Sequence, residues 1–120
     1  MTALVLSPAE VRRLLPMGEC IDLVEQAFRV LARGGATNPL RTGMRLPDGL
    51  GLLGMMPGYL DEPRALGIKV VAVFPGNHGT EFDAHQGIVV LFETEHGRPV
   101  AILDAASRCA NGPWSACPIG

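Results

Sequence analysis

Hydrophobic positions in the first third of the chain follow a helical period. Apolar residues recur three or four positions apart, at Ile21, Val24, Phe28 and Leu31. This spacing predicts an amphipathic helix that ends at Gly34–Gly35, with an i,i+4 pair between Glu25 and Arg29 on its other side. A shorter helix through Leu15 is predicted before it. The stretch "SPAE" at residues 7–10 has the form of a capping box, with proline at the first helical position.

After residue 35 the pattern changes from helical to extended. Strand-like runs follow at residues 38–46, 50–56, 65–74, 87–93 and 99–104. They are separated by turn-forming segments, and "TEHGR" between the last two predicts a hairpin. Two helices followed by about five strands, with no alternating helices, predict an α+β fold with a mixed, largely antiparallel sheet.

One charged residue interrupts the most hydrophobic run, "LGIKVVAVFPGN". Strand alternation puts Lys69 on the same face as Val71 and Val73, so both faces of this strand are apolar. Such a lysine either belongs to an edge strand and reaches water, or is a cation held for an anion. Arg41, in "NPLRT", is a second cation on a neighbouring strand-like run. Two convergent cations suit a carboxylate, which arginine binds through two parallel hydrogen bonds and lysine as a point charge.

Two other patterns do not point to a cofactor or a metal. "GLGLLG" at residues 49–54 satisfies G-x-G-x-x-G, but Pro57 and Gly58 follow, so no helix can begin there to receive a pyrophosphate. We interpret it as a strand containing glycines. The long loop before residue 87 either lines a cleft or forms a solvated surface. The polar side chains of this loop do not have the spacing of metal ligands. They are Asn77, His78, Glu81, Asp83, His85 and Gln86.

Composition narrows the class of protein. The 120 residues suffice for one domain. The net charge of -2 provides no excess of positive charge that would attract nucleic acid. The apolar runs are too short to span a membrane, and the N-terminus lacks the features of a secretory signal. The three cysteines, Cys20, Cys109 and Cys117, suggest neither a disulfide framework nor a zinc site. We therefore expect a cytoplasmic protein.

Several of these motifs occur together in one known family. "NPLRT", "GMMPGYL", "LGIKVVAVFPGN" and "HQGIVVLFETEHGRPVAILDA", in this order and spacing, resemble the ornithine cyclodeaminase/mu-crystallin family over about residues 7–105. The resemblance implies that residues 1–105 form a substrate-binding and dimerisation domain, which in the family precedes an NAD(P)-binding Rossmann domain. It also implies that Arg41 and Lys69 bind the substrate carboxylate and that Met56 lines the same pocket.

The family resemblance further implies a class of chemistry. Family members are lyases or oxidoreductases that deaminate and cyclise amino acids, dehydrogenate them, or reduce imines. They use NAD(P). The partners implied for this chain are a small α-amino or α-keto acid and other copies of the chain in a homo-oligomer, with no nucleic acid and no membrane.

After Ala105 the sequence departs from the family pattern. Residues 106–120 show no periodicity, and Gly112 stands where the family has a further substrate-binding arginine. We expect an irregular tail here, a frameshifted or prematurely ended reading frame, no Rossmann domain in this chain, and no turnover by the chain alone. Two alternatives remain: a non-catalytic oligomerising or ligand-binding module, and a non-functional fragment.

Overall fold

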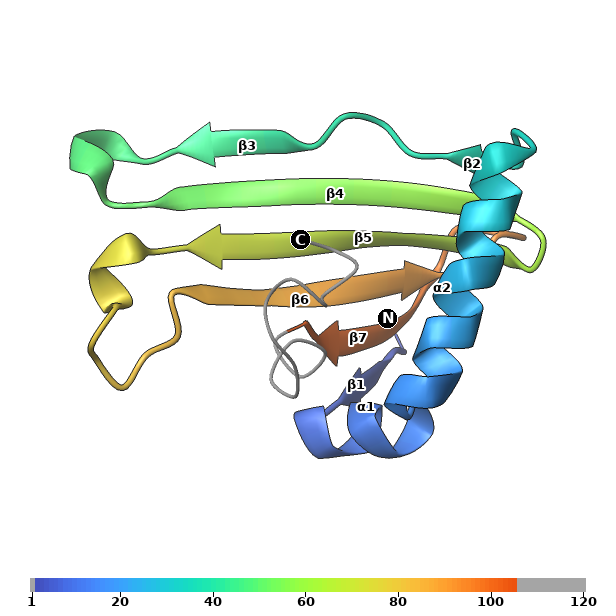
Figure 1. Ribbon diagram of the computed structural model, residues 1–120, viewed down its shortest axis with the longest axis horizontal. Helices are drawn as coiled ribbons and strands as arrows, with labels where there is room; N and C mark the ends of the chain where they lie inside the picture. Colours follow the sequence, from blue (N-terminus) through green and yellow to red (C-terminus); the bar gives the residue numbers. More distant parts are fainter. Residues whose placement is uncertain (1, 106–120) are drawn as a thin grey trace.

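The computed structural model describes residues 2–105, which contain two α-helices, two short 3-10 helices and seven strands in one sheet (Figure 1). The sheet order is β1-β7-β6-β5-β4-β2, and β3 also pairs with β4. The elements are β1 (Leu4–Leu6), α1 (Pro8–Leu14), α2 (Met17–Ala32), β2 (Ala36–Thr37), β3 (Thr42–Arg45), η1 (Pro47–Gly49), β4 (Leu52–Asp61), β5 (Arg64–Val73), η2 (Pro75–Asn77), β6 (His85–Phe92) and β7 (Pro99–Asp104).

Several predictions concern residues outside the described range. These are the irregular tail over residues 106–120, the substitution at Gly112, and two of the three cysteines, Cys109 and Cys117. The domain boundary at residue 105 stays a prediction. No helix within residues 2–105 is long and apolar enough to cross a membrane.

Both predicted helices are confirmed. The capping box of α1 is formed: the backbone N–H of Glu10 donates to Ser7 Oγ at 3.2 Å, and the backbone N–H of Ser7 donates to Glu10 Oε2 at 2.7 Å. Helix α2 ends just before Gly34, whose φ of 83° is the left-handed conformation typical of a glycine after a helix. The ion pair expected between Glu25 and Arg29 is present at 2.7 Å.

The sheet has more strands than the sequence predicted. The α+β class and the mixed sheet are confirmed, but the described residues form seven strands rather than about five. The prediction missed β1 and β2 because they span only three and two residues, too few to show a period. β1 pairs in parallel with β7, and the other pairings are antiparallel.

β4 also extends beyond its predicted end. "PGYLDEP" was expected to be a loop, yet the strand continues through Pro57 and Gly58 to Asp61. Pro57 lies between the stretch of β4 that pairs with β2 and the stretch that pairs with β3. A proline is tolerated at such an interruption because its missing N–H costs no ladder bond there. The connection to β5 shortens to Glu62–Pro63, joined by a cis peptide bond.

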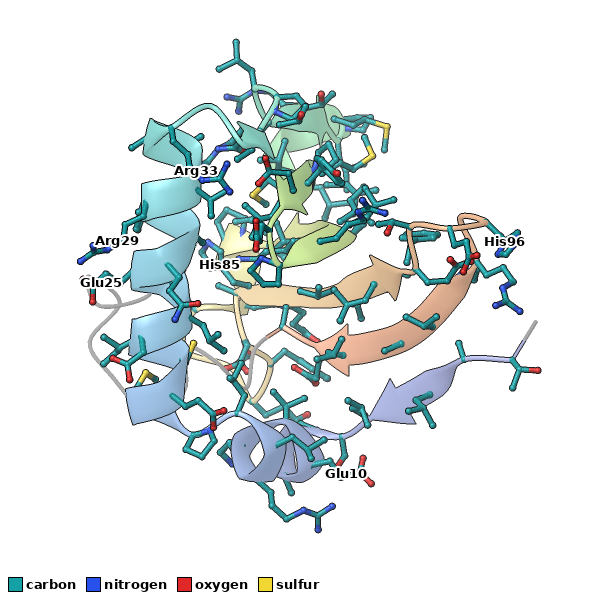
Figure 2. All side chains as sticks on the ribbon, turned by 90° about the vertical axis from the view of Figure 1, so that its right-hand side faces the viewer. Glu10, Glu25, Arg29, Arg33, His85 and His96 are labelled. Carbon is teal, nitrogen blue, oxygen red and sulfur yellow. The ribbon has the colours of Figure 1, made fainter. Side chains whose placement is uncertain are left out.

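The helices lie on one side of the sheet. Figure 1 shows α2 crossing in front of the strand ends, and in Figure 2 it stands to one side of the sheet. Val11 of α1 packs on Ala101 and Leu103 of β7, with Leu6 and Val89 partly buried around them. We call the face carrying these sheet residues the helix-side face. The other is the open face, which no helix covers among the described residues; its residues include Leu53, Ile68, Ile88, Val90, Val100 and Ile102.

The predicted apolar side of α2 is buried only in part. Of the four residues predicted on this side, Val24 is half-buried, Leu31 is 42% exposed, and Ile21 and Phe28 are each 59% exposed. The buried residue of α2 is Val30, which the predicted set did not include. Among the strands, α2 contacts chiefly β2 and β4, which lie at one edge of the sheet. Part of its apolar stripe therefore lies beyond the edge of the surface on which it packs.

Candidate functional site

Lys69 lies in the middle of a central strand. β5 pairs with β4 on one side and with β6 on the other, so the edge-strand interpretation of this lysine is wrong. Its register partners are Met56 of β4 and Val89 of β6. Lys69 is half-buried and shares the helix-side face with Val71 and Val73, as alternation predicted. A cation at this position is therefore held among apolar neighbours on both adjoining strands.

The structure places the three predicted site residues on or beside three neighbouring strands. Met56 of β4 is directly opposite Lys69 of β5. Arg41 immediately precedes Thr42, the first residue of β3, and Thr42 pairs with Met55 on the other side of β4. We call Arg41, Met56 and Lys69 the basic row.

Glycines flank the basic row on the same face of the sheet. Gly54 and Gly58 lie two residues to either side of Met56 in β4, and Gly67 lies two residues from Lys69 in β5, opposite Gly58. An added Cβ would meet no heavy atom within 4 Å at Gly58, but it would lie 3.3 Å from Val71 Cγ1 at Gly54 and 3.0 Å from the carbonyl oxygen of Val90 at Gly67. Of the three glycines, only Gly58 leaves its backbone open to close approach. Sequence reasoning missed this arrangement, because only the cross-strand register shows that these glycines share one face.

The loop between β5 and β6 uses its polar side chains to hold its own backbone. Asn77 Nδ2 donates to the carbonyl of Asp83 at 3.0 Å, and Gln86 Nε2 donates to the same carbonyl at 3.2 Å. Thr80 Oγ1 donates to the carbonyl of Asn77 at 2.7 Å. Of the two interpretations of this loop, a cleft lining and a solvated surface, the exposure of most of these side chains favours the solvated surface. The side chains of His78, Glu81, Asp83 and His85 are exposed.

The described residues do not assemble a metal site. Residues 2–105 contain no group of three or more His, Cys, Asp or Glu side chains arranged to hold a metal ion. Figure 2 shows His85 and His96 well apart from one another.

The glycine pattern at residues 49–54 does not suit a nicotinamide dinucleotide. It runs from η1 into β4, as the strand interpretation predicted, and so leads into a strand. A dinucleotide fingerprint needs the N-terminus of a helix for the pyrophosphate. The residues described here therefore do not fit the cofactor at this motif.

Two carboxylates at strand ends accept hydrogen bonds from groups close to them in the fold. Asp61 Oδ1 and Oδ2 accept hydrogen bonds from the guanidinium of Arg33 at 2.6 and 3.1 Å, which lowers the pKa of Asp61. Glu93 accepts hydrogen bonds from the backbone N–H groups of Arg98 and His96, each at 2.9 Å, which lowers its pKa to about 2. Both carboxylates are thus engaged in holding turns and strand ends.

Comparison with known proteins gives a consistent result. The sequence matches the ornithine cyclodeaminase/mu-crystallin family over residues 1–111. A relative, Δ1-pyrroline-2-carboxylate reductase of Bacillus cereus, is 31% identical over 103 residues, which cover 86% of this chain and 32% of the relative.

Solved structures share the fold. Thermococcus litoralis Δ1-pyrroline-2-carboxylate reductase, in complex with NADH and L-proline, matches with a TM-score of 0.81 and 33% identity, covering 88% of this chain and 34% of that one. An archaeal alanine dehydrogenase dimer with bound NAD matches with a TM-score of 0.78 and 33% identity, covering 88% of this chain and 32% of that one. The chain thus spans about a third of the length of these proteins.

Proposed function

Because the chain belongs to the ornithine cyclodeaminase/mu-crystallin family, we propose that residues 2–105 supply the carboxylate-binding part of a site for a small α-amino, α-imino or α-keto acid. Arg41 and Lys69 bind the carboxylate, and Met56 lies between them. The observation that carries this proposal is the register of β4 and β5, which pairs Met56 with Lys69, together with the position of Arg41 directly before β3 on the other side of β4.

The chemistry of the row suits such a ligand. Arginine presents a planar fork that matches a carboxylate, and lysine adds a compact positive charge. A hydrogen bond to a charged group is worth about 1.5–3 kcal/mol, and partial burial of Lys69 strengthens its attraction to an anion. Placing the lysine on a central strand holds its backbone rigidly, which favours a fixed orientation for the ligand.

We infer that the complete reaction is an oxidoreduction that uses NAD(P). A relative is a reductase, one solved neighbour binds NADH and L-proline, and another is an alanine dehydrogenase with NAD. In this proposal the described residues bind and orient the carboxylate, and residues beyond them hold the nicotinamide. We therefore expect residues 2–105 by themselves to bind ligands without turning them over.

We further propose that a second copy of the chain covers the open face. Ile88 and Val100 on this face are 43% and 39% exposed, and Val70, Val90 and Ile102 beside them are apolar, although Asp104 lies opposite Ile88. An uncovered apolar surface of this kind marks an association site. The alanine dehydrogenase with the same fold is a dimer, which supports the same arrangement here.

Isothermal titration of the purified chain with L-proline, L-alanine and pyruvate tests the carboxylate site. Lys69→Gln and Arg41→Gln should each weaken binding about tenfold or more, because each removes a charge-assisted hydrogen bond. Arg45→Gln is the matched control. Arg45 is the last residue of β3, at the other end of the strand from Arg41, and it pairs with Leu52 rather than with a residue near Lys69. Wild-type chain that binds none of the three ligands, or Lys69→Gln that binds as wild type does, would contradict the proposal.

A further inference from the structure

Helix α2 is held to the sheet mainly at its C-terminal end. Its buried residue is Val30, whereas Met17 and Ile21, nearer its N-terminus, are 48% and 59% exposed. The strands that it chiefly contacts are β2 and β4, and β2 has only two residues. Because burial of apolar surface is the main force that holds a helix on a sheet, this thin packing leaves α2 dependent on other contacts.

Hydrogen bonds tie the last turn of α2 to the end of β4. The guanidinium of Arg33 donates to Asp61 through both terminal nitrogens, from Nη2 to Oδ1 at 2.6 Å and from Nη1 to Oδ2 at 3.1 Å. The backbone N–H of Asp61 donates to the carbonyl of Gly35 at 2.9 Å, and the backbone N–H of Gly35 donates to the carbonyl of Val30 at 2.9 Å. Figure 2 shows Arg33 at the end of α2, on the side that faces the strands. The ion pair therefore joins two elements whose paired residues are 28 positions apart in the sequence.

Gly35 provides the space in which this ion pair forms. A Cβ added there would lie 2.5 and 2.7 Å from the two carboxylate oxygens of Asp61, and 2.7 Å from Nη1 of Arg33. Any side chain at this position would therefore displace the paired groups. The φ of Gly35 is not among the positive values, so the pair, and not the backbone conformation, is the reason for a glycine here.

The ion pair can break without burying a charge. The Arg33 side chain is 50% exposed and the Asp61 side chain is 42% exposed, so both groups keep contact with water when they separate. Two parallel hydrogen bonds make the pair stronger than an ordinary surface pair. Salt screens exposed charges, with a Debye length of about 10 Å at 0.1 M and about 3 Å at 1 M. Ionic strength therefore controls how firmly this end of α2 is held.

We propose that the Arg33–Asp61 pair is a salt-sensitive latch: when it breaks, the C-terminal half of α2 separates from the end of β4 as one unit, while β4, β5 and β6 stay paired. Proteins open locally in cooperative units, and a unit with few buried apolar contacts opens at a low free energy. The three strands pair along most of their length and so belong to a more stable unit. The inference concerns α2 and does not depend on the carboxylate site.

Amide hydrogen exchange of the full chain, measured by mass spectrometry at one pH and temperature, tests the latch. Asp61→Asn keeps the shape of the side chain and removes its charge. It should speed the exchange of residues 27–33 about fivefold or more, and change that of β5 and β6 by less than about twofold. Gly35→Ala should act in the same direction, because its Cβ displaces the pair. Raising sodium chloride from about 0.1 M to about 1 M should speed exchange of residues 27–33 in wild type but not in Asp61→Asn.

Glu25→Gln is the matched control. It removes the other ion pair of α2, which has an N–O distance of 2.7 Å and joins two residues of the helix itself. Exchange of residues 27–33 should stay within about twofold of wild type in this variant. Unchanged exchange of these residues in Asp61→Asn, or equal acceleration in Glu25→Gln, would overturn the latch. Acceleration of β5 and β6 by the same factor as α2 would overturn the separate opening, since it would report unfolding of the whole domain.

Discussion

A lysine in a central strand loses hydration free energy on folding that a surface lysine keeps. Lys69 is half-buried between Met56 and Val89, so its ammonium group loses part of its hydration on folding. An anion bound against it returns favourable interactions to that charge. A ligand that binds only the folded chain also raises the free energy of unfolding by mass action. Binding at the basic row should therefore be visible as a rise in the melting temperature.

Glu93 makes the stability of the β6–β7 turn depend on pH. Its pKa is lowered to about 2 from an ordinary value of 4.5 by hydrogen bonds from backbone N–H groups of the turn, with a further contribution from Arg98. A lowered pKa stabilises the folded state above about pH 4.5, and this contribution is lost as the pH falls toward 2.

The corresponding prediction concerns Glu93→Gln. Urea unfolding at fixed protein concentration should show a smaller free energy of unfolding than wild type at pH 6, and a difference that shrinks by pH 3, since the lost interaction belongs to the ionised carboxylate. Glu95→Gln, in the same turn, is the control and should stay close to wild type at both values. A Glu93→Gln deficit that is the same at pH 6 and pH 3 would argue against this role.

Residues whose role depends on local sequence were predictable. Ser7 and Glu10 form the expected capping box, and alternation placed Lys69 on the correct face. Gly58 and Gly67 were not recognised, because their pairing depends on the register of two strands and on a turn only two residues long. A cross-strand property of this kind is absent from the period of either strand alone.

At the scale of elements, length decided what could be predicted. Strands β5, β6 and β7 were placed within two residues of their observed ends because each carries a long hydrophobic run. β1 is too short to show a period, and it exists through its parallel pairing with β7. The extension of β4 was hidden by Pro57, a residue that ordinarily ends a strand. Tertiary pairing overrides local preference at each of these places.

The contact between α1 and β7 anchors the helix layer, and this gives a prediction for Leu103. Leu103 is 7% exposed and packs with Val11 and Ala101. Leu103→Ala should lower the free energy of unfolding by about 2–5 kcal/mol, the usual range for a buried leucine that leaves a cavity. Leu14→Ala is the matched control, since Leu14 is 60% exposed on α1 and its loss should change stability little. Equal effects of the two substitutions in chemical unfolding would show that this cluster is not the core.

At the scale of the whole molecule, the two faces of the sheet differ in what covers them. The helix-side face carries the basic row and the packed cluster around Val11. The open face carries mainly apolar residues and is covered by no helix in the part of the chain that the structure describes. Lys69 thus lies on the opposite face from the proposed dimer contact, so one surface can associate while the other binds ligand.

Sedimentation velocity tests the association. Val100→Lys puts an ammonium group into the proposed contact, and desolvating an unpaired charge should raise the dimer dissociation constant on the order of 100-fold. Ile21→Lys is the control, because Ile21 is 59% exposed on α2 and belongs to a different surface. A wild-type chain that sediments as a monomer at all concentrations, or a Val100→Lys chain that remains dimeric, would rule out the open face as the interface.

The parallel pairing of β1 with β7 also sets an order of assembly. Leu4 pairs with Ala101, so this contact closes nearly the whole described chain into one loop and costs more chain entropy than any hairpin. Strands β4, β5 and β6 pair with their sequence neighbours and close much shorter loops. On a ribosome the strands that carry Met56 and Lys69 emerge and pair first, while β1 waits for β7. The basic row thus forms before β1 pairs with β7 and fixes the N-terminus. We expect β1 to be the first strand to exchange its amide protons.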